Sequence, residues 1–190
     1  MLKLNLEEEA LQKLKKMAGS ASYNFLGFTL DLEKNAMKDN FGQAAKYFTQ
    51  WHIQLFSTLL THYSKADLVP LSGKQVKFKD LPGGCAYEGA FIKRAVQPIA
   101  DVFGVNPQEF PKAAALLGGK TLTHGDASAE INALKGIPLT YFVWAAEEYP
   151  ASASILYDES ASKYLPTEDL AVLGELTSVR LIEAKNCKLI

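Results

Sequence analysis

The chain has 190 residues, of which 48% are hydrophobic and 22% charged, and these are the proportions of a folded protein with a packed core. Its 20 basic and 21 acidic side chains give a formal net charge of -1, which argues against nucleic acid as a partner. No stretch approaches the roughly 20 apolar residues of a membrane helix, and the charged N-terminus does not resemble a signal peptide. We therefore expect a cytoplasmic protein with no membrane partner.

The first third of the chain predicts helices and a strand. A helix is expected over residues 6–18, where Gly19 ends it. Residues 25–32 alternate apolar and polar side chains, which is typical of a half-buried strand. Residues 43–63 carry a broad apolar stripe that includes Trp51, and this pattern indicates a long helix at the centre of the core.

The middle of the chain predicts a short strand and two helices. Residues 74–81 alternate, with lysines on one face, as in an edge strand. Residues 87–104 have helical periodicity interrupted by Pro98, which should kink the helix. A further helix over 107–117 is expected to start with Asn106 as its cap and Pro107 in its first turn.

The last third predicts two paired strands followed by a helix. The continuous apolar run 137–146 should pair antiparallel with 154–158 and be buried on both faces near Trp144, and Thr167 should cap the final helix. We expect an α+β fold in which a mixed, largely antiparallel sheet packs with several helices. Residues 1–190 should form a single domain that includes the helices at 6–18 and 43–63.

The stretch LPGGCAYEGAF, residues 81–91, is the most site-like local feature. Gly83 and Gly84 lead into a helix whose free amides could hold an anion, and Arg94 follows within a few turns. Glu88 would compete for the same amides, and a tight strand-to-helix turn explains the glycines equally well.

Two stretches offer candidate catalytic residues. Cys85 lies near a helix N-terminus, where a thiol can become a nucleophile, but its histidine base would have to come from a remote part of the chain. The stretch 124–130 brings together His124, Asp126 and Glu130, which could ligate a metal or form a polar surface turn. We expect no metal site, and no CxxC pair suggests a cluster or zinc.

The polar stretch after the second predicted strand has two interpretations. Asp158, Ser160 and Tyr164 could bind a ligand, or they could hold a turn together through hydrogen bonds to the backbone. We favour the structural interpretation of these three residues.

Several ordered motifs resemble a known family. LPGGCAYEGAF, LGGK, HGDAS and the stretch 137–176 together resemble the domain of unknown function 3786 family over most of residues 70–180. The resemblance supplies no activity. It implies a source among anaerobes. It also implies an accessory role in anaerobic one-carbon or redox metabolism, because some members carry an upstream cysteine-rich iron-sulfur segment that is associated with one-carbon proteins. The resemblance implies four cysteines in such a segment, and this chain lacks them, so an electron-transfer role would need a partner.

The family-like stretches contain a set of residues to which the resemblance assigns no role: Gly83, Gly84, Tyr87, Arg94, Asp126, Trp144, Asp158, Ser160 and Tyr164. Backbone geometry would explain the two glycines. Trp144 could belong to the core, and Arg94 could form an ion pair with Asp126 or Asp158.

Three hypotheses remain for the function. The first is a non-enzymatic module that binds a small anionic or planar ligand, or a partner protein. The second is a hydrolase or transferase that uses Asp126, His124 or Cys85. The third is a domain that assembles with copies of itself, and all three leave the cofactor unidentified. The first hypothesis places its site at these residues: Gly83, Gly84, Tyr87, Arg94, Asp158 and Tyr164.

Overall fold

The computed structural model describes residues 1–42 and 50–187, and they form two antiparallel sheets packed with helices. The first sheet has the strand order β1-β4-β3-β2, and the second has the order β5-β9-β8-β7-β6. The α+β prediction is confirmed, with two sheets in place of one. The strands of the first sheet are β1 (Leu2–Lys3), β2 (Ser22–Phe25), β3 (Phe28–Asp31) and β4 (Ala36–Asp39). Those of the second are β5 (Gln75–Lys77), β6 (Lys120–Leu122), β7 (Ala127–Leu134), β8 (Ile137–Trp144) and β9 (Ser152–Asp158).

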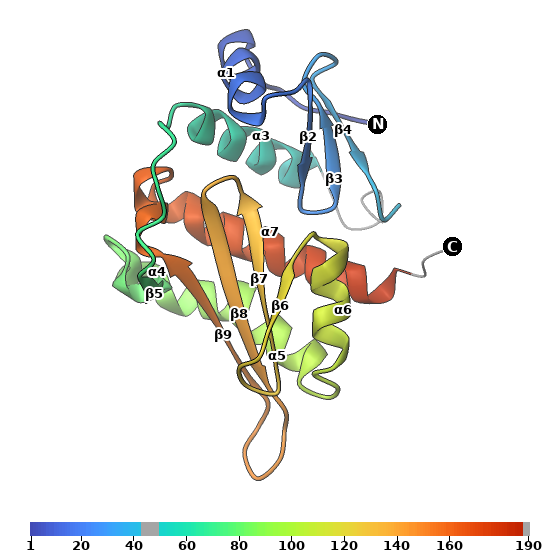
Figure 1. The fold of residues 1–190 in the computed structure, drawn as a ribbon, viewed down its shortest axis with the longest axis vertical. Coiled ribbons are helices and arrows are strands. Elements are labelled where there is room, and N and C mark those ends of the chain that lie inside the picture. The colour runs from blue at the N-terminus through green and yellow to red at the C-terminus, as the bar shows by residue number, and fades with distance from the viewer. Residues whose placement is uncertain (43–49, 188–190) are drawn as a thin grey trace.

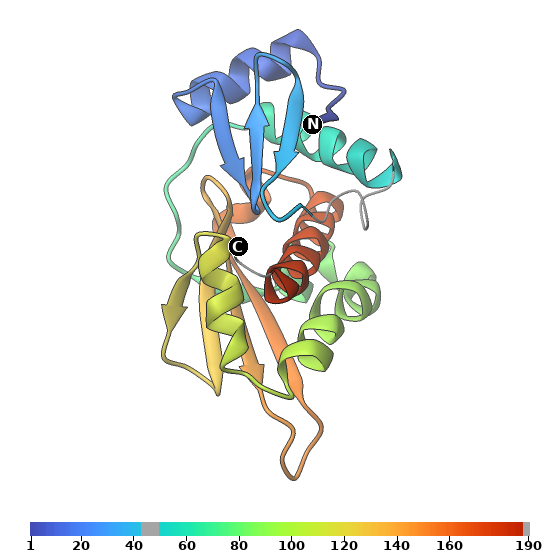
Figure 2. The same ribbon diagram turned by 90° about the vertical axis from the view of Figure 1, so that its right-hand side faces the viewer.

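The two sheets lie at opposite ends of the long axis of the molecule (Figures 1 and 2). The first sheet lies beside helices α1 (Glu8–Ala18) and α3 (Gln50–Ser64). Helices α4 (Gly84–Phe91), α5 (Gln97–Phe103) and α6 (Glu109–Leu116) lie along the second sheet. Helix α7 (Thr167–Asn186) runs between the two parts.

Helix α7, rather than the predicted helix 43–63, is the central helix of the fold. Tyr157 of β9 donates a hydrogen bond of 2.8 Å to the carbonyl of Leu170, and a Cβ at Gly174 would lie 2.5 Å from the Tyr157 hydroxyl. Residues 43–49 of the predicted helix lie outside the described part of the chain. In α3, Trp51 is 57% exposed, because the buried face carries other residues: Ile53, Phe56, Leu59, Leu60 and Tyr63.

The strand predicted over 25–32 is present as β3, but the predicted bounds also include Phe25 of β2 and the turn between the two strands. Strands β2 and β3 meet at Leu26 and Gly27, which have φ angles of 47° and 74°. Two consecutive positive φ values are those of the tight turn that suits the twist of paired strands. Leu26 is an unusual residue for such a turn, which explains why the alternating pattern was interpreted as continuous.

The predicted strand pair in the last third is confirmed as β8 and β9, in antiparallel register from Leu139 opposite Tyr157 to Trp144 opposite Ser152. The expected burial at the far end is wrong, because Trp144 is 39% exposed. The polar loop expected at 124–130 is present only as far as Asp126. It leads into β7, a full strand paired with β8, whose alanine, serine and asparagine residues gave no strand signal.

The predicted helix 87–104 is divided by a π-helical turn over Ile92–Val96. This turn lies directly before Pro98 in the first turn of α5. Pro98 has no N–H to donate to the carbonyl four residues earlier, so the expected interruption takes the form of a wider turn. Strand β5 is an edge strand, as predicted, but it ends at Lys77 and continues as a 3-10 turn over Phe78–Asp80.

Two predicted helix caps are wrong. Helix α6 begins after Gln108, and no side chain caps it. Helix α7 begins after Pro166, and the Thr167 hydroxyl instead donates a hydrogen bond of 2.6 Å to the carbonyl of Pro82. Thr167 therefore joins α7 to the turn before α4.

Candidate functional site: a groove beside strand β9

The residues predicted to form one site lie in three separate places. Gly83, Gly84 and Tyr87 lie at the start of α4, and Arg94 lies in the π-helical turn. Asp126 precedes β7 in the turn that follows β6. A third group, consisting of Asp158, Ser160 and Tyr164, follows β9.

Asp158 is buried and holds the segment before β5 against the end of β9. Its carboxylate accepts hydrogen bonds from the backbone N–H and the hydroxyl of Ser72, both at 2.9 Å, and from the N–H of Gly73 at 2.8 Å. The Ser160 hydroxyl adds another at 2.6 Å. Burial alone would raise the pKa of Asp158, but these donors outweigh it and hold the pKa well below its usual range. The structural interpretation of Asp158 and Ser160 fits this geometry.

Tyr164 fastens the same segment at a second point. Its hydroxyl donates to the carbonyl of Val69 at 2.6 Å and accepts from the N–H of Val69 at 2.9 Å. The hydroxyl therefore has both a donor and an acceptor partner within the fold, and Tyr164 also acts as a structural residue.

In the glycine turn before α4, backbone N–H groups already donate hydrogen bonds within the chain. Gly83 has a φ of 76°, and a Cβ on Gly84 would lie 2.0 Å from the carbonyl oxygen of Phe78. The N–H of Gly84 donates to Leu81, and the N–H of Ala86 donates to Gly83. Two of the amides that an anion would need are thus used, which favours the tight-turn interpretation.

The exposed side chains of this region pair with α7. Tyr87 donates a hydrogen bond of 2.8 Å to Glu168, whose carboxylate raises the pKa of the tyrosine. Arg94 lies 3.9 Å from Glu175 across the molecular surface. The proposed pairing of Arg94 with Asp126 or Asp158 is therefore wrong.

Cys85, His124 and Asp126 do not converge on one centre. Cys85 donates to the carbonyl of Lys79, next to the β5 edge of the second sheet, whereas His124 and Asp126 lie in the turn between β6 and β7. In the strand order of this sheet, β9 and β8 lie between β5 and the β7–β6 pair. Asp126 accepts a hydrogen bond of 2.7 Å from the N–H of Ala145 and holds the turn, as an Asp-initiated surface turn would.

The alternative metal site at residues 124–130 is also unsupported. Glu130 lies within strand β7, opposite Lys120 of β6, and not in the turn with His124. Across residues 1–42 and 50–187, no group of three His, Cys, Asp or Glu side chains is arranged to hold a metal ion.

A groove beside β9 is the most site-like cavity. It has a volume of about 290 Å³ and lies between the first half of β9 and the helical segment that includes the π-helical turn. The strand wall carries Ala151–Ile155, and the polar end carries Lys77 and Lys79. The helical wall consists of the following side chains: Glu88, Phe91, Ile92, Val96, Gln97 and Ala100.

The shape of the groove follows from contacts at its two ends. At one end, the rings of Phe78 and Phe91 stack with centroids 4.2 Å apart, which fixes α4 against the 3-10 turn. At the other end, a Cβ on Gly104 would lie 2.2 Å from the Cβ of Ala151, so the end of α5 touches the chain that enters β9. Between these contacts, the π-helical turn presents Ile92, which is 44% exposed. Such turns are frequent at functional sites.

Two larger hollows lack this combination of features. One of about 490 Å³ lies beside Trp144 and Tyr149, with Glu147 and Glu148 on its rim. Another of about 360 Å³ lies between α1 and the end of α3, beside Lys13 and Lys16. The first of them reaches only Ser152, the first residue of β9, and neither of them includes an interrupted helix.

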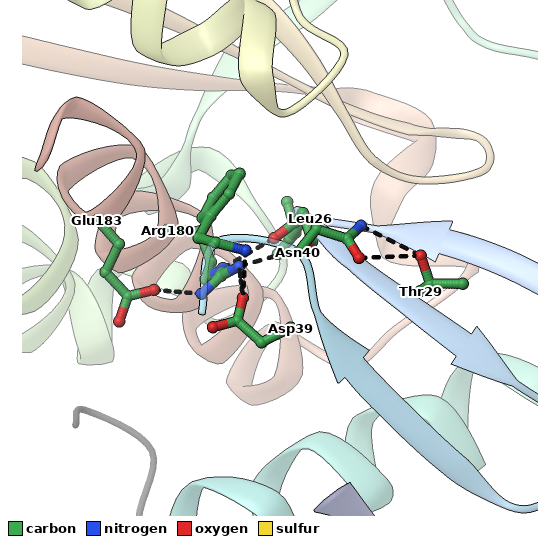
Figure 3. Close-up of polar contacts among 8 residues, drawn as sticks. Leu26, Thr29, Asp39, Asn40, Arg180 and Glu183 are labelled. Carbon is green, nitrogen blue, oxygen red and sulfur yellow. Dashed lines mark hydrogen bonds and ion pairs between the residues drawn. The ribbon is translucent and has the colours of Figure 1, made fainter. Parts of the chain in front are cut away.

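The most deeply buried charged cluster surrounds Arg180 of α7 (Figure 3). Its guanidinium donates to the carbonyl of Leu26 at 2.9 Å, to Asp39 at 2.6 Å and to Glu183. The Phe28 ring lies 3.9 Å from the guanidinium carbon. The cluster connects the first sheet to α7. The sequence indicates this cluster only by the position of Arg180, which continues the apolar stripe of Leu170, Leu173 and Leu176 along the helix.

Glu183 contributes an unusual atom to this cluster. One of its carboxylate oxygens accepts from Arg180, and the other, Oε1, is buried and has no hydrogen-bond partner among residues 1–42 and 50–187. Burial raises the pKa of Glu183, although Arg180 opposes the shift.

Comparison with protein families matches the sequence model for a domain of unknown function, DUF3786, to residues 8–180. The chain belongs to the DUF3786 family. The match includes β2, β3 and β4 of the first sheet and the whole second sheet, and only β1 of the two sheets precedes it. Searches of curated proteins and of solved structures give no match. Among the described residues, this DUF3786 protein has no helix long and apolar enough to cross a membrane.

Proposed function

We propose that this DUF3786 protein is a non-catalytic binding module, and that its ligand occupies the groove beside β9. The observation that carries the proposal is the position of the π-helical turn, which lies directly opposite an open strand edge across the groove. An interrupted helix and a strand edge both place backbone and apolar groups where a ligand can contact them.

The enzyme hypothesis has weaker support. Cys85 lies next to β5, whereas His124 and Asp126 lie in the turn between β6 and β7, and general acid–base chemistry needs groups within hydrogen-bond reach of one substrate. The binding proposal therefore uses a different set of residues: Ile92, Val96, Lys77, Lys79 and Ala153 replace all of those expected from the sequence.

The accessory role in anaerobic one-carbon or redox metabolism remains a prediction from the family resemblance, and the cytoplasmic location remains a prediction from the sequence. A binding module of this kind fits an accessory role, because it would act by holding another molecule and not by transforming it. The groove itself carries no residue that selects this metabolism over another.

Site-specific photocrosslinking in the cells that produce the protein tests the proposal. A photoreactive phenylalanine analogue at Ile92 should give a crosslinked adduct on irradiation. The same analogue at Trp51, which is also exposed but lies on α3 outside the groove, should not. The adduct mass distinguishes a small molecule, a partner protein and a second copy of the chain. Equal adducts at both positions, or none at either, would contradict a binding function for the groove.

A further inference from the structure

Strand β9 has an open edge along the groove. Strand β5 pairs with β9 only from Leu156 to Asp158, and the chain then leaves the sheet at Phe78. Within the described residues, no strand pairs with Ser152–Ile155 on this side. An unpaired strand edge presents backbone donors and acceptors to any extended chain that reaches it.

The alternation of hydrogen bonds shows which residue of β9 faces the groove. The N–H of Glu159 donates to Lys74, so the odd-numbered residues of β9 direct their backbone groups toward β5. Independently, the carbonyl of Val143 accepts from Asp126 on the far side of β8, and its cross-strand partner on β9 is Ala153. Both observations place the N–H and C=O of Ala153 toward the groove.

The groove walls restrict what can pair with this edge. Ala151 and the stretch Ser152–Ser154 have small side chains, so another backbone can approach β9 closely. Across the groove, Ile92 and Val96 offer apolar contacts to every second side chain of an extended segment. Lys77 and Lys79 outnumber Glu88 among the charged residues of the groove, which favours an acidic side chain at that end.

We infer that the occupant of the groove is an extended peptide segment of a partner protein, which adds to β9 as an extra strand. The segment directs apolar side chains toward Ile92 and Val96 and an acidic side chain toward Lys77 and Lys79. This inference rests on the proposed binding function of the groove and specifies its ligand as polypeptide.

Selection from a library of random eight-residue peptides displayed on phage tests the inference. Peptides enriched on the wild-type protein should alternate apolar side chains and contain an acidic residue. Ala153→Pro, which removes the N–H that faces the groove and is compatible with a strand edge, should weaken their binding at least tenfold. Lys77→Glu with Lys79→Glu should also weaken it, whereas Lys163→Glu, at an exposed lysine outside the groove, should not.

The outcomes separate this inference from the proposed function. Failure to enrich any peptide, or equal binding to Ala153→Pro, overturns strand addition, even if the crosslink at Ile92 identifies a small molecule. If Ala153→Pro does not fold, as judged by circular dichroism, enriched peptides with N-methylated backbones replace it. Those peptides cannot donate hydrogen bonds to β9, so unchanged binding overturns the inference and lost binding supports it.

Discussion

Asp158 is a buried carboxylate kept ionised by neutral donors. Its hydrogen bonds come from backbone N–H groups and serine hydroxyls on both sides of the chain, and no lysine or arginine contacts it among the described residues. Such an arrangement stabilises the charged carboxylate, because the fold holds several hydrogen-bond donors in position to interact with it. Its role is to hold the segment before β5 in place, and with it the polar end of the groove.

Replacing Asp158 with asparagine should lower the free energy of unfolding by about 1.5 to 3 kcal/mol. The asparagine NH2 group is itself a donor, so it cannot accept the hydrogen bonds that one of the carboxylate oxygens accepts. Chemical denaturation at pH 7 measures this loss. Ser72→Ala, which removes only one hydroxyl donor, should cost about 1 kcal/mol. Equal effects of the two substitutions would contradict the assignment of the carboxylate as the centre of this network.

The same carboxylate predicts a pH dependence. The pKa of Asp158 is lower in the folded state than in the unfolded chain, so its stabilisation is complete above the unfolded pKa of about 4. It is lost as the pH falls toward the folded pKa. The difference in unfolding free energy between wild type and Asp158→Asn should therefore shrink below about pH 4, and denaturation curves from pH 7 to pH 2 measure it. A difference that stays constant over this range would contradict the lowered pKa.

At the scale of single elements, two glycines of α4 make opposite predictions. A Cβ at Gly84 would lie 2.0 Å from a backbone oxygen, whereas a Cβ at Gly89 would meet nothing within 4 Å. Gly89→Ala should raise the free energy of unfolding by about 0.5 to 1 kcal/mol, since alanine restricts the unfolded chain and favours helix. Gly84→Ala should lower the free energy of unfolding, because the 3-10 turn that carries the Phe78 carbonyl would have to move away from the new Cβ. Urea denaturation measures the free energy of unfolding of both variants. A Gly84→Ala variant as stable as the wild type would contradict a close contact between residue 84 and the Phe78 carbonyl.

The sequence predicted those elements whose pattern is local. The helices near residues 6–18 and 107–117 carry periodic apolar residues, and β8 is a continuous apolar run. These helices and the pair β8–β9 lie within a few positions of their predicted bounds. Strand β7 was missed because its small and polar residues become buried only when β6 and β8 pair with it. The hairpin at Leu26 was missed for a related reason, because the packing of Phe25 and Phe28 on Phe56 fixes a turn that leucine does not favour.

The candidate site was even less accessible from the sequence. Its walls come from β9 and from the π-helical turn, and neither the open edge of β9 nor the width of the turn is visible in a linear pattern. Asp158 and Tyr164 were singled out correctly as residues that needed an explanation, but that explanation is a set of hydrogen bonds to a segment about 90 residues earlier in the chain.

At the scale of the whole molecule, Arg180 connects the two sheets. It contacts the hairpin of the first sheet from a helix that packs on the second, and a contiguous core includes residues of both. We propose on this basis that the chain forms a single domain that unfolds in one transition. Differential scanning calorimetry should give one peak, and two resolved peaks would contradict it.

Arg180→Met should lower the free energy of unfolding by about 3 to 5 kcal/mol, because the buried carboxylates of Asp39 and Glu183 would lose their common cation. Amide hydrogen exchange should rise first in β2–β4. Glu183→Gln is the matched control, since a glutamine oxygen can still accept from Arg180, and it should change stability by less than about 1 kcal/mol at low pH. An Arg180→Met protein as stable as wild type would contradict this role.

Glu183 adds a pH dependence of the opposite sign to that of Asp158. Because its pKa is raised on folding, its contribution to stability is complete below the unfolded pKa of about 4.3 and declines as the pH rises through the folded value. The stability of Glu183→Gln relative to wild type should therefore increase from pH 4 to pH 7. Denaturation of both proteins over this range measures it, and a constant difference would contradict the raised pKa.

The long separation between Arg180 and the hairpin that it contacts also determines when the protein can fold during its synthesis. Leu26 is translated early, whereas Arg180, which donates a hydrogen bond to its carbonyl, is translated 154 residues later. Until then the β2–β3 turn lacks the cation that holds it, and α7 is not available to cover the second sheet. A nascent chain that stalls before residue 180 should therefore expose both apolar surfaces at once and depend on chaperones for as long as the stall lasts.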